Sequence, residues 1–372
     1  MACCGGKTGV RTDFGRYPKA IPDTSKWARS PNVADQFEAQ QMRTQVGLKQ
    51  DAPFTYSGAN LAACQFPIGG FGAGYVILGG DGTFQAYNIV NQVRKESLPM
   101  HCMPAGFFAI TATPSGEAAQ SVLLASPETY TVDNCALPPN KPARVSVSSV
   151  KRLESLPGIQ SLRLTGRYPI AEVQYNITKF PVDVQLEAFS PMCPLNDKDS
   201  SLPVGVFTFS VTNSGTTSVA VRVMQSQQNL VGWDGQTDCT QPSATTFWGG
   251  NVNTATASGI LMSNPSQPSG ADRSNEAFGT VAVESVSTSS AATTTVILDG
   301  VSEEDIYAKF TSNKDVAPVA GTATAASATG SSYCGGVVQS VTVAPGATET
   351  VTFVLAWHFP NRSNKQRFVQ HH

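Results

Sequence analysis

Charged residues are scarce in this chain. Asp, Glu, Lys and Arg make up only 14% of its 372 residues, and the formal net charge is −2. About a quarter of the residues of an average globular protein are charged. Lys and Arg do not cluster beyond the pairs Arg94-Lys95 and Lys151-Arg152. The chain therefore lacks the basic patch that nucleic acids require, and we expect no nucleic-acid partner.

Long hydrophobic runs are also missing. No run approaches the roughly 18 apolar residues that a membrane-spanning helix needs, and the N-terminal residues lack the apolar segment of a secretory signal. The sequence thus predicts a cytoplasmic protein without a transmembrane segment. Cys3 and Cys4 are candidates for acylation, which leaves peripheral membrane association open. Residue 2 is Ala, however, so the myristoylation pattern fails.

Metal-binding and disulfide patterns are not found either. The chain has eight Cys and four His, and no two cysteines form a Cys-x-x-Cys pair. In a chain this long, such thinly spread cysteines indicate free thiols rather than a disulfide framework. We expect no metal and no other cofactor.

The sequence is rich in strand and turn residues. Val182, Val184, Leu186 and Ala188 alternate with polar residues, the pattern of a strand with one buried face. Such segments recur from about residue 55 onward, without βαβ alternation. The pattern predicts a mainly β fold, a large antiparallel β-sandwich with a few short helices. We expect an irregular segment over residues 1–54, the sandwich over 55–362 and a tail over 363–372.

Two longer segments read as hairpins, and a third as a helix. Residues 206–225 and 340–359 each hold two alternating apolar rows around a turn sequence, Asn-Ser-Gly in the first and Pro-Gly in the second. Ser302 precedes three acidic residues and the apolar pair Ile306 and Phe310. Because carboxylates stabilise a helix N-terminus, we expect a helix that begins at Ser302.

The stretch FPIGGFGAGYVILGGDGTFQAYN, residues 66–88, holds seven glycines. A dinucleotide fingerprint needs Gly-x-Gly-x-x-Gly before a helix, but Tyr75 stands where the third glycine belongs and a strand pattern follows. Without a helix N-terminus, no aligned N–H groups face a phosphate. We expect Gly70, Gly72 and Gly74 to permit close backbone approach, and Gly79 to Gly82 to join two strands.

This glycine-rich stretch resembles the N-terminal domain of glycoside hydrolase family 116, which includes non-lysosomal glucosylceramidases and bacterial β-glucosidases. Further similar segments follow in the same order: GRYPIAEVQY at 166–175, VDVQLEAFSPMCPLNDKDSSLPVGVFTFSVTN at 182–213, QNLVGWDG at 228–235 and AWHFPNR at 356–362. Together they span about residues 55–362. The family places an N-terminal β-sandwich beside an (α/α)6 barrel that performs retaining hydrolysis of β-glucosides with two carboxylates.

The resemblance stops before the barrel. No stretch of the 372 residues looks like it, so the resemblance assigns no catalytic residue, and we expect the chain alone to be inactive. The implied partner is a catalytic (α/α)6 domain, in the same chain or another. β-Glucosides or glucosylceramide would be bound through the whole enzyme. Asp197, Asp199, Asp234 and Asp238 lie in Pro-, Asn- and Gly-rich connections, where acidic residues usually form turns.

Two groups of residues are candidates for binding. Trp357, His358, Phe359, Asn361 and Arg362 follow the last strand pattern, and large aromatics and Arg are typical interface anchors. Trp233 and Trp248 lie in Gly-rich loops and could stack on sugars, although tryptophan is more often buried in a core. The alternative to an enzyme scaffold is a stand-alone glycan- or protein-binding module.

Overall fold

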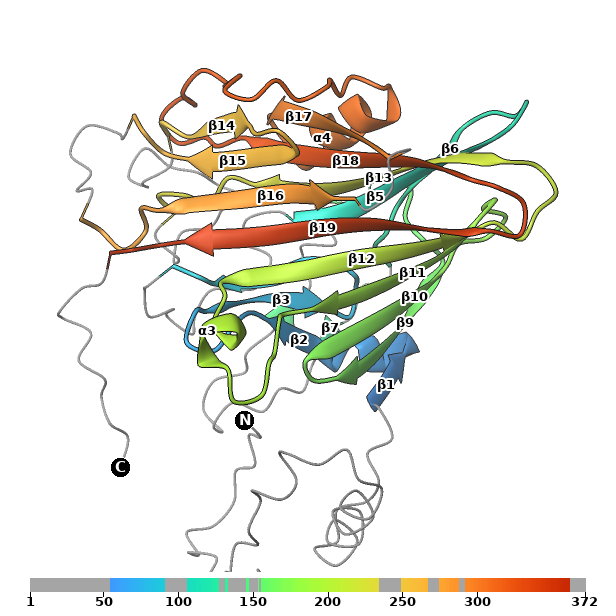
Figure 1. The fold of residues 1–372 in the computed structure, drawn as a ribbon, viewed down its shortest axis with the longest axis horizontal. Helices are drawn as coiled ribbons and strands as arrows, with labels where there is room; N and C mark the ends of the chain where they lie inside the picture. The colour runs from blue at the N-terminus through green and yellow to red at the C-terminus, as the bar shows by residue number, and fades with distance from the viewer. Residues whose placement is uncertain are drawn as a thin grey trace, which may run out of the picture. The chain divides into compact units, whose positions relative to one another are not determined.

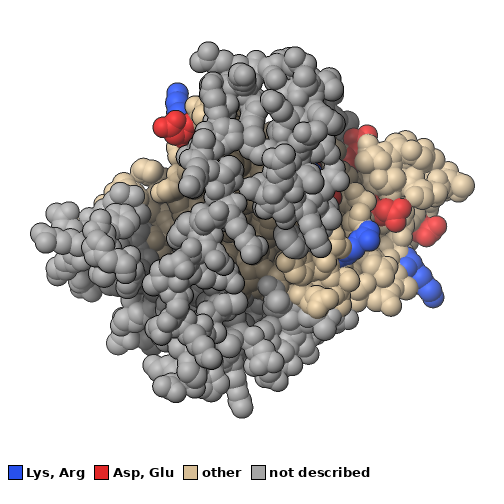
Figure 2. Space-filling view, turned by 90° about the horizontal axis from the view of Figure 1, so that it is seen from below, with Lys and Arg blue, Asp and Glu red and all other residues tan. Residues whose placement is uncertain are grey.

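The computed structural model describes residues 54–90, 106–126, 131–132, 145–146, 153, 155–233, 249–266, 274–287 and 292–361. The predicted irregular segment, apart from Phe54, and the predicted tail over 363–372 therefore lie outside the described residues. None of the described helices is long and apolar enough to span a bilayer. Charged side chains are few on the described surface that Figure 2 shows.

Two large antiparallel sheets dominate the described part of the chain, which confirms the predicted fold class (Figure 1). The nine-stranded sheet contains, in spatial order, β1 (Phe54–Ser57), β9 (Ser161–Arg167), β10 (Ile170–Asn176), β11 (Asp183–Phe189), β12 (Val204–Thr212), β19 (Thr348–His358), β16 (Thr280–Val286), β15 (Gly259–Ser263) and β14 (Val252–Ala255). The five-stranded sheet contains β17 (Thr293–Gly300), β18 (Cys334–Val343), β13 (Val219–Gln228), β5 (Gly106–Pro114) and β6 (Gln120–Leu123).

Smaller elements complete the described fold. A three-stranded sheet holds β2 (Gln65–Ile68), β3 (Tyr75–Gly79) and β4 (Phe84–Asn88), and a two-stranded one holds β7 (Thr131–Val132) and β8 (Val145–Ser146). The helices are η3 (Gly58–Ala63), α3 (Asp197–Ser200) and α4 (Glu303–Thr311). The pairing of β3 with β4 confirms the strands predicted on either side of the second glycine turn.

Aromatic rings join the three main sheets. Phe84 of β4 lies 5.4 Å from Phe108 of β5 and 5.2 Å from Phe207 of β12, between ring centroids. Phe108 also contacts Phe209, again on β12, at 5.0 Å. Edge-on contacts of this kind stabilise a core beyond the area they bury. The small sheet is thus part of the same hydrophobic core as the sandwich.

The two predicted hairpins are wrong in one respect. The strands form as expected, but β12 and β13 lie in different sheets, as do β18 and β19. β12 pairs with β19, and β13 pairs with β18. Alternating residues show which face of a strand is buried, but they cannot show whether the next strand pairs with it or packs opposite it. Each turn therefore carries the chain across the sandwich.

The predicted helix is confirmed as α4. The Ser302 side chain accepts a hydrogen bond from the backbone N–H of Asp305 at 3.1 Å, as an N-cap residue does. Ile306 and Phe310 are both buried. They join a hydrophobic cluster with Phe107 and Met224, so α4 packs against the five-stranded sheet.

Candidate functional site

Several connections between strands lie close to the C-terminal end of β19, at one end of the nine-stranded sheet. At this end β12 begins, with Val204 opposite Ala356, and β16 begins, with Thr280 opposite His358. The turn between β9 and β10 and the 190–203 connection, which contains α3, lie there too (Figure 1). We name residues 69–75, 168, 190–204 and 356–361 the exit end.

Trp357 connects two segments of the exit end through hydrogen bonds. Its side chain is 3% exposed, and its indole N–H donates a hydrogen bond to the carbonyl oxygen of Ala73 at 2.7 Å. Its backbone N–H donates to the carbonyl oxygen of Pro203 at 3.1 Å. The last strand therefore holds both the glycine turn after β2 and the connection before β12.

The residues after Trp357 alternate between exposed and buried. The side chain of His358 is exposed, and that of Phe359 is buried. The Asn361 side-chain amide donates to the backbone oxygen of Asn275 at 3.0 Å. Arg362 lies outside the described residues. Trp357, Phe359 and Asn361 thus hold this segment to the sandwich, and His358 faces solvent; contact with a second domain stays a prediction.

The glycine turn between β2 and β3 is shaped by close backbone contacts. A Cβ atom on Gly70 would lie 2.3 Å from the backbone oxygen of Leu202. The N–H of Phe71 donates to the backbone oxygen of Ser200 at 2.8 Å. Gly72 and Gly74 have φ values of +70° and +83°, which glycine adopts without strain. These contacts confirm the predicted close approach of the backbone.

Ser200 holds the 190–203 connection from inside, and the outer surface of the connection is mixed: Asn196, Asp197 and Lys198 are exposed there as well as apolar side chains. The buried Ser200 hydroxyl accepts from the N–H of Cys193 and donates to its carbonyl oxygen, both at 2.9 Å. Met192, Leu195 and Leu202 are exposed, Leu195 by 92%. Leu195 also has a φ of +66°, which is rare for a bulky residue. We name these three side chains the apolar ridge.

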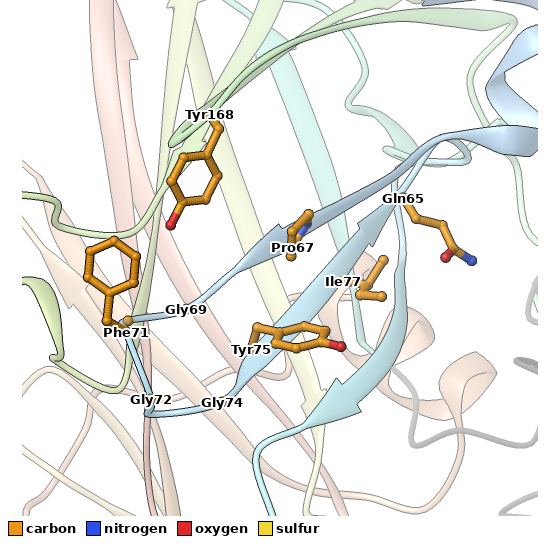
Figure 3. A pocket seen from close by; sticks show the side chains of 10 residues that line it. Gln65, Pro67, Gly69, Phe71, Gly72, Gly74, Tyr75, Ile77 and Tyr168 are labelled. Atoms are coloured by element: carbon orange, nitrogen blue, oxygen red, sulfur yellow. The ribbon is translucent and has the colours of Figure 1, made fainter. Parts of the chain in front are cut away.

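A cleft of about 620 Å³ lies beside the glycine turn. We name it the aromatic cleft. Figure 3 shows the rings of Phe71, Tyr75 and Tyr168 around the segment from Pro67 to Gly69. These rings are 55%, 39% and 55% exposed. The full lining is Gln65, Pro67, Gly69, Gly70, Phe71, Gly72, Gly74, Tyr75, Ile77 and Tyr168.

Two of the four aspartates considered in the sequence, Asp197 and Asp199, lie on the short helix α3. Asp197 is exposed on α3, and the Asp199 carboxylate accepts from the Asn196 amide at 2.7 Å. Asp81 is fully buried between β3 and β4, where the N–H and hydroxyl of Thr83 each donate to it at 2.9 Å. Burial raises the pKa of Asp81, and the bonds from Thr83 partly oppose that rise. Asp234 and Asp238 lie outside the described residues.

Metal-ligating side chains do not gather in the described part of the chain, where no group of three or more His, Cys, Asp or Glu could hold an ion. Trp233 is 1% exposed and packs in the main core, so its ring is enclosed rather than presented to solvent. Trp248 lies outside the described residues.

Sequence reasoning missed Phe71, Tyr75 and Tyr168 as candidates. One signal was present, because Phe71 stands between Gly70 and Gly72 in a turn too tight to bury a large ring. The nearness of Tyr168 had no such signal, since it depends on how β9 and β10 pack beside β2.

The chain is similar to one known protein family and to solved structures. Residues 65–372 match the sequence model of a family described as beta-glucosidase 2, glycosyl-hydrolase family 116 N-term. One similar solved structure, described as "Putative kojibiose phosphorylase from human microbiome", has 7% sequence identity and a TM-score of 0.31. The match covers 84% of this chain and 33% of that one, so the chain spans about a third of that protein.

The family match covers most of the chain, from β2 to its last residue. It includes the glycine turn, the 190–203 connection and Trp357, which together build the exit end. The chain therefore belongs to glycosyl-hydrolase family 116, as the N-terminal domain of that family.

Proposed function

We propose that this chain is the non-catalytic β-sandwich of a β-glucosidase or glucosylceramidase-like enzyme. Its role is to scaffold a catalytic (α/α)6 domain, in the same chain or in a second one. The parent reaction is the retaining hydrolysis of a β-glucosidic bond, for which two carboxylates lie about 5 Å apart. The family match supports the glycosidase context. We also propose a cytoplasmic location, where free thiols such as those of Cys64 and Cys193 stay reduced.

The apolar ridge is the observation that carries the docking role. A single exposed apolar side chain is ordinary on a protein surface, whereas several on one short connection indicate an interaction site. Met192, Leu195 and Leu202 lie on a connection whose backbone is held to Phe71 and to Trp357 through Ser200 and Pro203. A firmly held apolar surface loses little conformational entropy on binding. We therefore assign the ridge to the contact with the catalytic domain.

The coding sequence after His372 gives the first test. We expect an open frame that encodes helical hairpins with two suitably placed carboxylates. A stop codon at this position, in a genome without any separate (α/α)6 partner, would favour the stand-alone binding module instead.

A binding experiment tests the ridge itself. The domain and the helical domain are produced separately, and their association is followed by analytical ultracentrifugation. Leu195→Asp and Leu202→Asp should each weaken association at least tenfold, because a charge would be desolvated in the contact. Val319→Asp is the matched control, since Val319 is also exposed but lies outside the exit end. Equal weakening by all three variants would contradict the assignment.

Activity separates the scaffold from a self-contained hydrolase. We expect the 372-residue chain alone to release no nitrophenol from an aryl β-glucoside. Turnover that Asp199→Asn abolishes would overturn the scaffold proposal, because Asp199 would then act as a catalytic carboxylate.

A further inference from the structure

The aromatic cleft carries an inference beyond domain docking. Three rings with substantial exposure surround one hollow, whereas isolated exposed apolar side chains are the ordinary case. We propose that the aromatic cleft is a carbohydrate-binding site that holds a neutral pyranose ring against Phe71, Tyr75 and Tyr168. The site binds sugar without breaking a bond, and its test is separate from the test of the apolar ridge.

The floor of the cleft is a rigid sheet surface. Pro67 of β2 pairs with Ile77 of β3, and both side chains face the cleft with that of Tyr75. The alternate residues of these strands, Phe66, Ile68, Val76 and Leu78, are buried in the main core. A floor fixed by core packing on its other side does not need to be ordered when a ligand binds, which favours affinity.

Phe71 is exposed, yet its backbone is held in place. Its N–H is bonded to Ser200, and the carbonyl oxygen of the nearby Ala73 accepts the Trp357 indole N–H. Gly70, on the other side, packs directly on the backbone of Leu202. The fold therefore projects a large apolar ring from a turn that is anchored on both sides of it. Exposure of that ring adds nothing to folding stability, and a bound ligand would cover it.

The chemistry of the lining favours a neutral sugar. None of the ten lining residues is Asp, Glu, Lys or Arg, so a phosphorylated or carboxylated ligand would find no counter-charge. The C–H bonds on one face of a pyranose carry partial positive charge, and an aromatic ring face is negative. The phenol groups of Tyr75 and Tyr168 can donate to or accept from sugar hydroxyls. The Gln65 amide lines the same cleft.

The size of the cleft is consistent with this ligand. Its volume of about 620 Å³ lies within the range of small-molecule sites, roughly 300–1,000 Å³. A purely apolar segment of another protein would leave the two phenol oxygens and the glycine backbone groups desolvated, at a cost in free energy. A sugar presents both C–H faces and hydroxyls, so it can satisfy both parts of the lining.

Titration of the 372-residue chain with cellobiose, followed by calorimetry and by NMR, tests the site. Cellobiose supplies two β-linked glucose rings without an alkyl group or a charge. We expect saturable binding that Phe71→Ala and Tyr168→Ala each weaken roughly tenfold, the scale of one aromatic contact. Tyr75→Phe should weaken binding less than Tyr75→Ala, because it removes only the hydroxyl group.

Two control variants separate this site from the apolar ridge. Leu195→Ala removes an exposed side chain of the ridge, and Val319→Ala removes one far along the chain in the 313–333 segment. Both should bind cellobiose as the unchanged chain does. Circular dichroism confirms that each variant folds, which we expect because all the altered side chains are exposed.

Three outcomes would overturn the proposal. The first is an absence of binding at every concentration up to the solubility of cellobiose. The second is binding that Phe71→Ala and Tyr168→Ala leave unchanged. The third is protection of the cleft by the catalytic domain alone, seen in hydrogen exchange, with no response to sugar. That last result would make the cleft part of the docking surface, whereas failure of sugar binding by itself leaves the ridge assignment standing.

Discussion

Two glycine-rich turns belong to the same three-stranded sheet, but one is exposed to solvent and the other is buried. The turn from Gly69 to Gly74 carries the exposed Phe71. The turn from Gly79 to Gly82 is buried, with Asp81 fully enclosed. In the first, glycines allow the chain to approach its neighbours and present a ring to solvent. In the second, they allow the chain to fit inside the domain.

The comparison separates two uses of glycine that look alike in sequence. A Cβ on Gly80 would lie 2.1 Å from the backbone oxygen of Leu61, whereas a Cβ on Gly72 would meet nothing within 4 Å. The buried turn is thus limited by space, and Gly72 is limited by its positive φ alone. Limited space at the buried turn affects folding stability. The positive φ of Gly72 leaves its surroundings open, so that part of the turn can form a functional surface.

Gly80→Ala should give the largest effect. The added methyl group collides with backbone rather than with a flexible side chain, and the N–H of Gly80 is already bonded to the carbonyl oxygen of Cys64 at 3.0 Å. We expect a loss of about 3 kcal/mol or more in the free energy of unfolding, measured by urea denaturation. Gly116→Ala is the comparison, because Gly116 has a positive φ but open space around it, so only backbone conformation opposes that substitution. Equal losses would show that the close contact of Gly80 with Leu61 does not limit the substitution.

Asp81→Asn should change how stability depends on pH. Burial raises the pKa of Asp81 in the folded protein above its unfolded value, so the folded state holds its proton more tightly. The stabilising contribution is therefore present below the unfolded pKa and is lost as pH rises through the folded pKa. The asparagine variant cannot ionise, so its stability relative to the unchanged chain should rise as the pH increases from the unfolded pKa of about 4 toward neutral.

Thermal unfolding of both proteins over this pH range measures the difference. A relative loss of stability by Asp81→Asn on going to neutral pH would contradict the prediction. It would mean that the hydrogen bonds to the carboxylate, those from Thr83 and Gln85 among them, outweigh the cost of burying the charge.

Gly72→Ala should give the smallest effect. The site is spacious, so only the left-handed backbone conformation opposes the substitution, at about 1 kcal/mol. Gly74→Ala is the matched control in the same turn, because its Cβ would lie 2.3 Å from the backbone oxygen of Asn88. We expect a much larger loss there, again by urea denaturation. A loss for Gly72→Ala as large as that for Gly74→Ala would show that space, and not φ alone, limits Gly72.

Local patterns predicted the strands and the α4 cap correctly. Alternation along β11 and the Ser302 signal depend on neighbours in sequence, so both were readable. The pairing of β12 with β19 joins residues about 140 positions apart, and no local pattern specifies it. The hairpin interpretation failed for this reason.

Only part of the candidate site could be predicted from the sequence. The buried row that ends at Trp357 followed from alternation, and the close approach of Gly70 followed from its residue type. The aromatic cleft depends on Tyr168 from the β9–β10 turn lying near Phe71. That nearness arises from the stacking of separate sheets, which a single sequence does not display.

The central place of β19 has a consequence for biosynthesis. β19 is the last described strand, yet it lies between β12 and β16 in the nine-stranded sheet. Until it leaves the ribosome, β14, β15 and β16 have no edge through which to join β12. Nascent chains that end before residue 348 would therefore expose two unpaired strand edges, and such edges invite aggregation. Completion of this domain must wait for almost all of its residues to be translated.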